Sequence, residues 1–188
     1  MKKKLNVIVV STRPGRMGLP IAQWFMDRAR EHAGFEPVLV DLKEFALPLF
    51  DEPKHPRLGQ YEHEHTKLWS ASVASGDAFV FVTPEYNFSA PPSLLNAIDF
   101  VFREWAYKPA GFVSYGGVSG GLRGVQMSKL ALTSVKVMPM VEAVTIPSFS
   151  THFQDGAFAP PAPLADSAKA MLDELVRWAD ALRPLRGA

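Results

Sequence analysis

The chain has 188 residues, of which 47% are hydrophobic and 21% charged, and its formal net charge is +1. This length suits one domain with its own core, and the composition is that of a globular protein rather than a disordered or fibrous one. A charge so close to zero gives no strong field for capturing nucleic acid or an anionic membrane, so we expect small-molecule partners. The sequence contains no cysteine, which excludes disulfides, thiolate nucleophiles and cysteine-ligated metals.

Neither the N-terminus nor any later segment is typical of a targeting or membrane sequence. Three lysines precede an apolar stretch of about six residues, whereas a signal peptide needs roughly 7–15. Every apolar run is soon broken by Pro, Gly or a charge, well short of the ~20 residues of a membrane span. We therefore expect a cytoplasmic protein without a membrane partner.

Five short apolar runs, rich in Val, Phe or Ile, predict β-strands. They cover residues 5–10, 35–40, 78–82, 111–115 and 138–146. Segments with helical spacing alternate with them, as at residues 94–102, and another follows the last run at residues 171–182. This alternation predicts one α/β domain over residues 1–188, with a parallel sheet, right-handed crossovers and helices on both faces.

Caps and first-turn prolines predict helix starts at residues 18–20, 89–92, 119–122 and 166, and Gly34 and Gly76 are natural stops. Two connections are longer and rich in proline, at residues 43–58 and 147–164. Connections of this length in a compact domain are often functional.

Three loops follow the carboxyl ends of predicted strands one, three and four. They cover residues 11–18, 84–89 and 114–121, and all three carry polar or glycine residues. In an open parallel sheet with strand order 2-1-3-4-5, ligands bind at the carboxyl ends of the strands, in the crevice between strands one and three. We therefore expect the three loops to line one site.

The composition of these loops indicates a phosphorylated planar ligand. The first loop offers hydroxyls and Arg13 ahead of a helix N-terminus, which suits a phosphate. The second offers Tyr86 and Asn87, and the third has four glycines that let the backbone approach a flat ring. A helix terminus contributes about 0.3–1 kcal/mol toward an anion, whereas nanomolar binding needs about 12 kcal/mol. The other two loops must therefore hold the ring.

The same segments resemble the NADPH-dependent FMN reductase family of flavodoxin-like proteins, over the chain to about residue 146. The resemblance rests on residues 11–13, 47–51, 84–87, 91–99 and 114–121, and Pro84-Glu85-Tyr86-Asn87 is its most diagnostic part. It implies a flavodoxin-like fold with non-covalently bound FMN and with NADPH or NADH as co-substrate. It also implies homodimers or homotetramers with the flavin near the subunit boundary.

The resemblance further implies which residues bind FMN. The phosphate is expected on Ser11, Arg13 and the turn formed by Met17 and Gly18. The isoalloxazine is expected against two loops, whose residues are Pro84, Glu85, Tyr86 and Asn87, and Ser114, Tyr115, Gly116 and Gly117. Many members have a hydroxyl residue near the position of Gly18, so backbone N–H groups replace one side-chain contact to the phosphate here.

The chemistry implied is hydride transfer from NAD(P)H through FMN to a small acceptor, such as a quinone, an azo compound, free flavin or a metal oxyanion. It requires no metal and no catalytic acid or base from the protein. One alternative is a flavodoxin-type electron carrier, although such carriers tend to be strongly acidic. Another is a serine hydrolase, because residues 117–121 match G-x-S-x-G around Ser119, with Glu142 and His152 as possible partners.

Other charged side chains leave alternatives open. Arg16 either contacts the 2′-phosphate of NADPH or is solvated. His63 and His65 are two residues apart on a helical stretch and are expected on different sides, whereas a metal site wants a spacing of three or four.

An aromatic cluster predicts a subunit contact, because one helix face cannot bury all of its members against one sheet. Its members are Phe100, Phe102, Trp105 and Tyr107. The connection at residues 147–164 either covers the flavin of a neighbouring subunit or ties the chain to the last helix.

Overall fold

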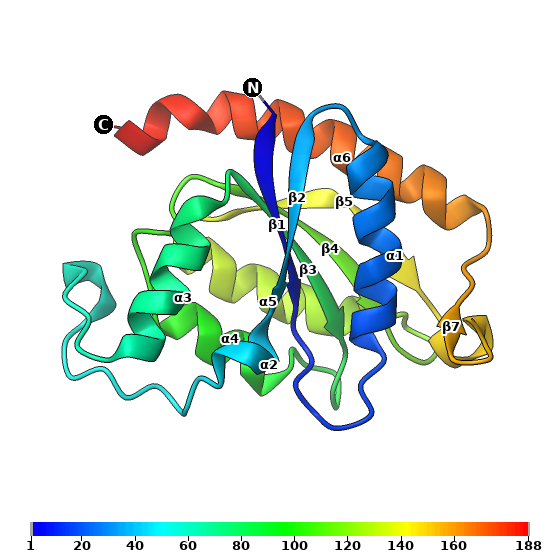
Figure 1. Ribbon diagram of the computed structural model, residues 1–188, viewed down its shortest axis with the longest axis horizontal. Coiled ribbons are helices and arrows are strands. Elements are labelled where there is room, and N and C mark those ends of the chain that lie inside the picture. The colour runs from blue at the N-terminus through cyan, green and yellow to red at the C-terminus, as the bar shows by residue number, and fades with distance from the viewer. Residues whose placement is uncertain (1, 188) are drawn as a thin grey trace.

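The computed structural model describes residues 2–187, so Met1 and Ala188 of the expected domain lie outside it. A central sheet lies between two layers of helices (Figure 1). Its strands are β1 (Lys3–Val9), β2 (Phe35–Asp41), β3 (Ala78–Pro84), β4 (Pro109–Tyr115) and β5 (Met138–Ile146). Their order is β2-β1-β3-β4-β5 and they pair in parallel, which confirms the predicted fold class and strand order.

Helices cover both faces of the sheet and enclose two cores (Figure 1). One face carries α1 (Gly18–Glu31) and α6 (Pro163–Leu182), and the other carries α3 (Glu64–Ser75), α4 (Pro92–Asp99) and α5 (Leu122–Ser134). All residues of β3 and β4 are buried, because both strands lie inside the sheet with a helical layer on either side. This double burial explains why their sequences are apolar without alternation.

Short elements complete the chain. Helix α2 (Leu42–Phe45) follows β2, and three 3₁₀ turns are η1 (Pro56–Leu58), η2 (Phe149–His152) and η3 (Arg183–Gly187). Strands β6 (Phe153–Gln154) and β7 (Ala157–Phe158) form a separate antiparallel hairpin. Helix α6 begins at Pro163, three residues before the predicted start, since a proline in the first turn needs no N–H partner.

Of the four aromatic residues after α4, Phe100 and Trp105 are packed inside the subunit and Phe102 and Tyr107 are partly exposed, so the subunit contact expected from their crowding stays a prediction. Helix α4 ends at Asp99, and the chain then turns back so that Phe100 and Trp105 are completely buried. The Trp105 ring lies 4.9 Å from that of Phe79 in an edge-on contact. Outside this core, the Arg57 guanidinium covers the Phe102 ring at 4.7 Å.

The connection at residues 147–164 packs on its own chain. The Phe149 ring meets that of Tyr115 edge-on at 5.3 Å, and the Phe158 ring meets that of Trp24 at 5.6 Å. These contacts favour the second alternative, in which the segment ties β5 to α6.

The two histidines near α3 lie together, contrary to the expectation that they point to different sides. His63 precedes the helix with an extended backbone, so its ring stacks on that of His65 at 5.2 Å. Both imidazoles face the Asp51 carboxylate, with the His65 Nε2 at 3.0 Å. Across residues 2–187, no group of three or more His, Asp or Glu side chains is arranged to hold a metal ion.

Candidate functional site

The predicted loops at the carboxyl ends of β1, β3 and β4 enclose one pocket of about 260 Å³. Its lining contains most of the predicted site residues, namely Ser11, Arg13, Met17, Pro84, Glu85, Tyr86, Tyr115, Gly116 and Gly117. Arg16 and Phe149 line it as well. Three loops far apart in the sequence therefore meet where the topology predicts a ligand site.

The loop from β1 to α1 leaves its backbone donors free. Within the described range 2–187, no backbone N–H of residues 11–17 donates to another protein group. Met17, the N-cap of α1, makes no side-chain capping bond, and the first turn of α1 carries no acidic residue. The exposed Arg13 guanidinium has no carboxylate within ion-pair distance among the same residues. Free N–H groups, an uncovered positive helix end and a free guanidinium fit a phosphate.

A hydrogen bond between two loops fixes the base of the pocket. The Tyr115 hydroxyl donates to the Ser11 Oγ over 3.2 Å, and both residues are buried. A Cβ on Gly18 would lie 2.6 Å from the Ser11 Oγ and 2.7 Å from the Tyr115 Oη, so only glycine fits there. Burial raises the pKa of Tyr115 to about 12, which keeps this hydroxyl protonated. Gly18 thus lies beneath the pocket, behind the residues that line it.

Glu85 joins the second loop to the start of α5. Its carboxylate is 8% exposed and accepts hydrogen bonds from the Ser119 Oγ and the Arg123 N–H, both at 3.0 Å, and from the Gly124 N–H at 3.4 Å. Burial raises the pKa of Glu85, but the hydrogen bonds from Ser119 and Arg123 lower it by more, so the pKa lies below its ordinary value. The carboxylate is therefore charged and acts as a cap for α5.

The bond to Glu85 also bears on the hydrolase alternative. The Ser119 hydroxyl donates to this carboxylate, and no histidine within residues 2–187 hydrogen-bonds to it. A nucleophilic serine needs a histidine that accepts its proton. The G-x-S-x-G match at residues 117–121 is therefore a helix-capping turn.

The glycine loop after β4 is held by its backbone oxygens and offers its N–H groups. Ser148 N–H donates to the Gly117 carbonyl at 2.8 Å and Phe149 N–H to the Gly116 carbonyl at 3.1 Å. In the described part of the chain, the N–H groups of Gly117, Val118 and Ser119 donate to no protein acceptor. A Cβ on Gly117 would meet nothing within 4 Å, so the loop is open to a ligand there.

Besides Gly18, two predicted residues do not line the pocket. Asn87 lies in a tight turn, where Tyr86 and Ser89 exchange backbone hydrogen bonds and Asn87 has a φ of 50°. Ser114 is fully buried beneath Gly121, where a glycine Cβ would lie 3.0 Å from the Ser114 Cβ. Its Oγ has no hydrogen-bond partner among residues 2–187.

Arg16 is paired with a carboxylate rather than solvated. Its guanidinium donates to both carboxylate oxygens of Asp41 and, at 2.8 Å, to the Ser11 carbonyl. The Arg16 and Asp41 side chains are only 11% and 7% exposed. The hydrogen bond with Asp41 is the largest cause that raises the pKa of Arg16. The expectation that Arg16 is solvated was wrong, because the end of β2 supplies a carboxylate that sequence reasoning missed, and the contact with the 2′-phosphate stays a prediction.

The doubly wound sheet with a crevice at the carboxyl ends of its strands defines a flavodoxin-like protein. The profile of the NADPH-dependent FMN reductase family matches residues 4–151, so the chain belongs to that family. It is therefore an oxidoreductase that uses FMN with NAD(P)H. No helix within residues 2–187 is long and apolar enough to cross a membrane.

Individual relatives agree with this assignment. An NAD(P)H-dependent FMN reductase of Schizosaccharomyces pombe is 40% identical over 147 residues, which cover 77% of this chain and 74% of the relative. An NADPH:quinone oxidoreductase of Arabidopsis thaliana is 33% identical over 108 residues, 56% of this chain and 50% of that protein. The solved structure of a flavoenzyme NAD(P)H:(acceptor) oxidoreductase from Paracoccus denitrificans has a TM-score of 0.74 at 24% identity, over 95% of this chain and 98% of that one.

Proposed function

We propose that the pocket at the ends of β1, β3 and β4 binds FMN without a covalent bond. The phosphate is assigned to residues 11–17 with Arg13, and the isoalloxazine to the space between residues 84–87 and 116–117. The observation that carries this proposal is that two loops with unpaired N–H groups face one pocket, beside a free guanidinium. The pocket volume of about 260 Å³ lies below the roughly 300–1,000 Å³ typical of ligand clefts and cavities, so part of the ring would extend beyond the pocket and stay accessible to substrates.

Each group of the chain has a distinct task in this proposal. Arg13 and the N-terminus of α1 neutralise the phosphate. The N–H groups of Gly117, Val118 and Ser119 donate to the polar edge of the ring and favour negative charge there. FMN, when bound, supplies the redox chemistry by taking a hydride from NAD(P)H and passing two electrons to an acceptor. No side chain is assigned the role of catalytic acid or base.

We propose a quinone or free flavin as the acceptor, with azo compounds and metal oxyanions as further members of the same class of planar or small oxidants. The name of the Arabidopsis relative supports the quinone. An exposed aromatic side chain near the pocket supports a flat acceptor, because Phe88, two residues after Tyr86 of the lining, is 69% exposed.

We also propose that the whole chain is one FMN-binding domain that forms a homodimer or homotetramer and acts in the cytoplasm, where NAD(P)H is supplied. Exposed apolar side chains on α5 and β5 support an oligomer, since Leu130 and Val141 are 71% and 87% exposed. Light scattering of the purified protein measures the mass of the assembly.

The central experiment is the absorbance spectrum of the purified protein near about 450 nm, where oxidised flavin absorbs, followed by NAD(P)H oxidation with a quinone. We expect yellow protein that oxidises NAD(P)H without an added reductase, which an electron carrier cannot do. Arg13→Gln should lose flavin on dilution, whereas the matched Arg30→Gln on the exposed far end of α1 should keep it. Colourless protein that cannot be reconstituted with FMN would contradict the proposal.

A further inference from the structure

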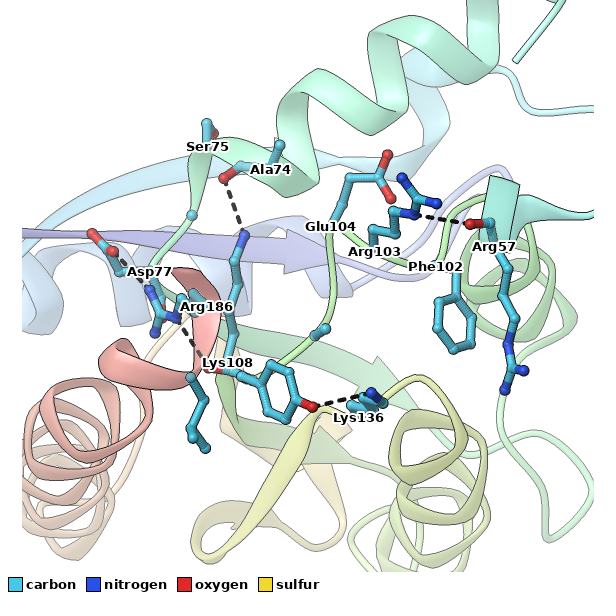
Figure 2. Close-up of a pocket in the computed structure, with 14 residues that line it drawn as sticks. Arg57, Ala74, Ser75, Asp77, Phe102, Arg103, Glu104, Lys108, Lys136 and Arg186 are labelled. Atoms are coloured by element: carbon cyan, nitrogen blue, oxygen red, sulfur yellow. Dashed lines mark hydrogen bonds and ion pairs between the residues drawn. The ribbon is translucent and has the colours of Figure 1, made fainter. Parts of the chain in front are cut away.

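A larger hollow lies at the opposite edge of the sheet, at the amino ends of β3, β4 and β5 (Figure 2). Its volume is about 800 Å³, against about 260 Å³ for the cofactor pocket. The last turn of α3, the segment 102–108, Lys136 and η3 form its walls. Strand β4 runs from this hollow to the cofactor pocket, and its seven residues span about 20 Å at roughly 3.3 Å each. A small ligand in one pocket therefore does not touch the other.

The lining of this hollow, which we call the basic pocket, is strongly positive. It contains two carboxylates, Asp77 and Glu104, and five cations, which are Arg57, Arg103, Lys108, Lys136 and Arg186. The net charge of +3 exceeds the +1 of the whole chain. The cations come from separate parts of the fold and surround the same space (Figure 2).

The two carboxylates are already engaged. Asp77 pairs with the Arg186 guanidinium at 3.0 Å and accepts the Lys4 N–H at 2.9 Å. Glu104 accepts hydroxyl hydrogen bonds from Tyr61 at 3.1 Å and Ser70 at 2.6 Å. Neither is within ion-pair distance of the other four cations.

Four cations are thus left with neutral partners within residues 2–187. The Lys108 ammonium donates to the carbonyls of Val73 and Ala74 at 2.9 and 3.0 Å, and the Lys136 ammonium to the Tyr107 hydroxyl at 3.0 Å. Arg103 donates through Nε to the Arg57 carbonyl, and Arg57 itself covers the Phe102 ring. Like charges collected in this way repel one another until an anion joins them.

The pKa of Lys108 depends on the charges around the basic pocket. It is 7% exposed, and burial first and the Arg186 charge second lower its pKa to about 8. A neighbouring anion would oppose both causes. The charges of Asp77 and Glu104 act in the same direction as such an anion would, but they do not outweigh burial and Arg186.

The basic pocket also has a flat apolar wall. Phe102, Tyr107 and Leu185 contribute to the lining, and Leu185 is 47% exposed. Tyr107 and Lys136 hold left-handed backbone conformations, with φ of 58° and 62°, and the Tyr107 N–H donates to the Lys136 carbonyl at 2.9 Å. Two non-glycine residues in this conformation are thus fixed against each other at the pocket wall.

We propose that the basic pocket binds a nucleoside di- or triphosphate, with the phosphates among Arg103, Lys108 and Lys136 and the base against the wall formed by Phe102 and Tyr107. The four cations without a carboxylate match the three to four negative charges of such a ligand. Phe102 and Tyr107 each carry a cation over one ring face, Arg57 at 4.7 Å and Lys136 at 5.0 Å, so a base would stack on the other face. This site is separate from FMN binding and from NAD(P)H oxidation.

The test is calorimetric titration of the FMN-saturated protein with ATP, pyrophosphate and adenosine. We expect ATP and pyrophosphate to bind, and adenosine to bind about tenfold more weakly than ATP or worse. Lys136→Glu should weaken ATP binding about tenfold or more and leave the rate of NAD(P)H oxidation unchanged. Lys67→Glu, an equal charge reversal on the exposed side of α3, should change ATP binding by less than about twofold.

Two further variants keep the result interpretable. Arg57→Glu, at an exposed position of η1, replaces Lys136→Glu if that protein does not fold. Arg13→Gln alters the cofactor pocket and should leave ATP binding unchanged. The proposal is overturned if ATP shows no saturable binding in the millimolar range, if Lys67→Glu weakens it as much as Lys136→Glu, or if Arg13→Gln abolishes it. Flavin content measured on the same samples tests FMN binding independently.

Discussion

Replacement of Glu85 by alanine should destabilise the protein mainly through the start of α5. The carboxylate accepts from two backbone N–H groups in the first turns of this helix and from the Ser119 hydroxyl. Loss of a helix cap costs about 0.5–2 kcal/mol, and a partly buried donor left without an acceptor, such as the Gly124 N–H, adds up to about 1–3 kcal/mol. The ion pair with Arg123 adds little, because the Arg123 side chain is 53% exposed.

We therefore expect Glu85→Ala to lower the free energy of unfolding by about 3 kcal/mol, which for a chain of this size lowers Tm by roughly 6–12 °C. Urea unfolding of the FMN-free protein measures the first quantity, and calorimetry the second. Arg123→Ala is the matched control, with an expected loss below about 1 kcal/mol. The affinity for FMN should fall as well, because the loops on both sides of the ring site are attached to Glu85.

The same carboxylate should make the stability of the fold depend on pH. The pKa of Glu85 in the folded protein lies below its ordinary value of 4.5, so the carboxylate stabilises the fold fully above that value. This contribution is lost as the pH falls through the lower pKa of the folded state. The difference in unfolding free energy between the wild type and Glu85→Gln should therefore shrink on acidification. If Glu85→Ala lost FMN but unfolded at the wild-type urea concentration, the carboxylate would contact the cofactor directly and the capping argument would fail.

Three other substitutions test the pocket. Gly18→Ala puts a Cβ within 2.7 Å of both the Ser11 and the Tyr115 hydroxyls, so urea unfolding of the FMN-free protein should show a loss of about 1–3 kcal/mol. Gly117→Val meets open space, so the FMN-free protein should keep its stability within about 0.5 kcal/mol while FMN affinity, followed by flavin fluorescence, falls about tenfold or more. Unchanged affinity would remove this loop from the site. Arg13→Gln should weaken FMN binding about tenfold and make the Kd for FMN less dependent on salt, measured at two ionic strengths. An unchanged dependence of Kd on salt would show that the guanidinium does not contact the phosphate.

The strands could be predicted from the sequence because the physical cause is local. Strands β3 and β4 are buried on both faces, so nearly all of their residues are apolar and the run is visible without knowledge of the fold. The place of the site followed from topology, since the carboxyl ends of parallel strands meet at one edge of the sheet. The loops at residues 11–17, 84–86 and 115–117 do line one pocket.

What could not be predicted are pairings between side chains distant in sequence. Arg16 and Asp41 are 25 residues apart, and nothing near either residue indicates the other. The burial of Phe100 and Trp105 depends on where α4 ends and how the chain turns back after it. The spacing of these residues indicates neither the end of the helix nor the turn. Glu85 was predicted as part of the ring site, but its carboxylate is directed at α5, which lies 37 residues further along the chain.

These long-range pairings have a common physical reason. A loop that keeps its N–H groups free for a ligand forgoes the backbone hydrogen bonds that normally hold a chain in place. The conformation must then be fixed by side chains, and the pocket shows three such attachments. Arg16 binds the Ser11 carbonyl while paired with Asp41, Tyr115 binds the Ser11 hydroxyl, and Glu85 binds the turn before α5. Each of these attachments uses a side chain or a carbonyl, so the N–H groups of residues 11–17 and 117–119 stay unpaired. The donors are therefore oriented before the ligand binds.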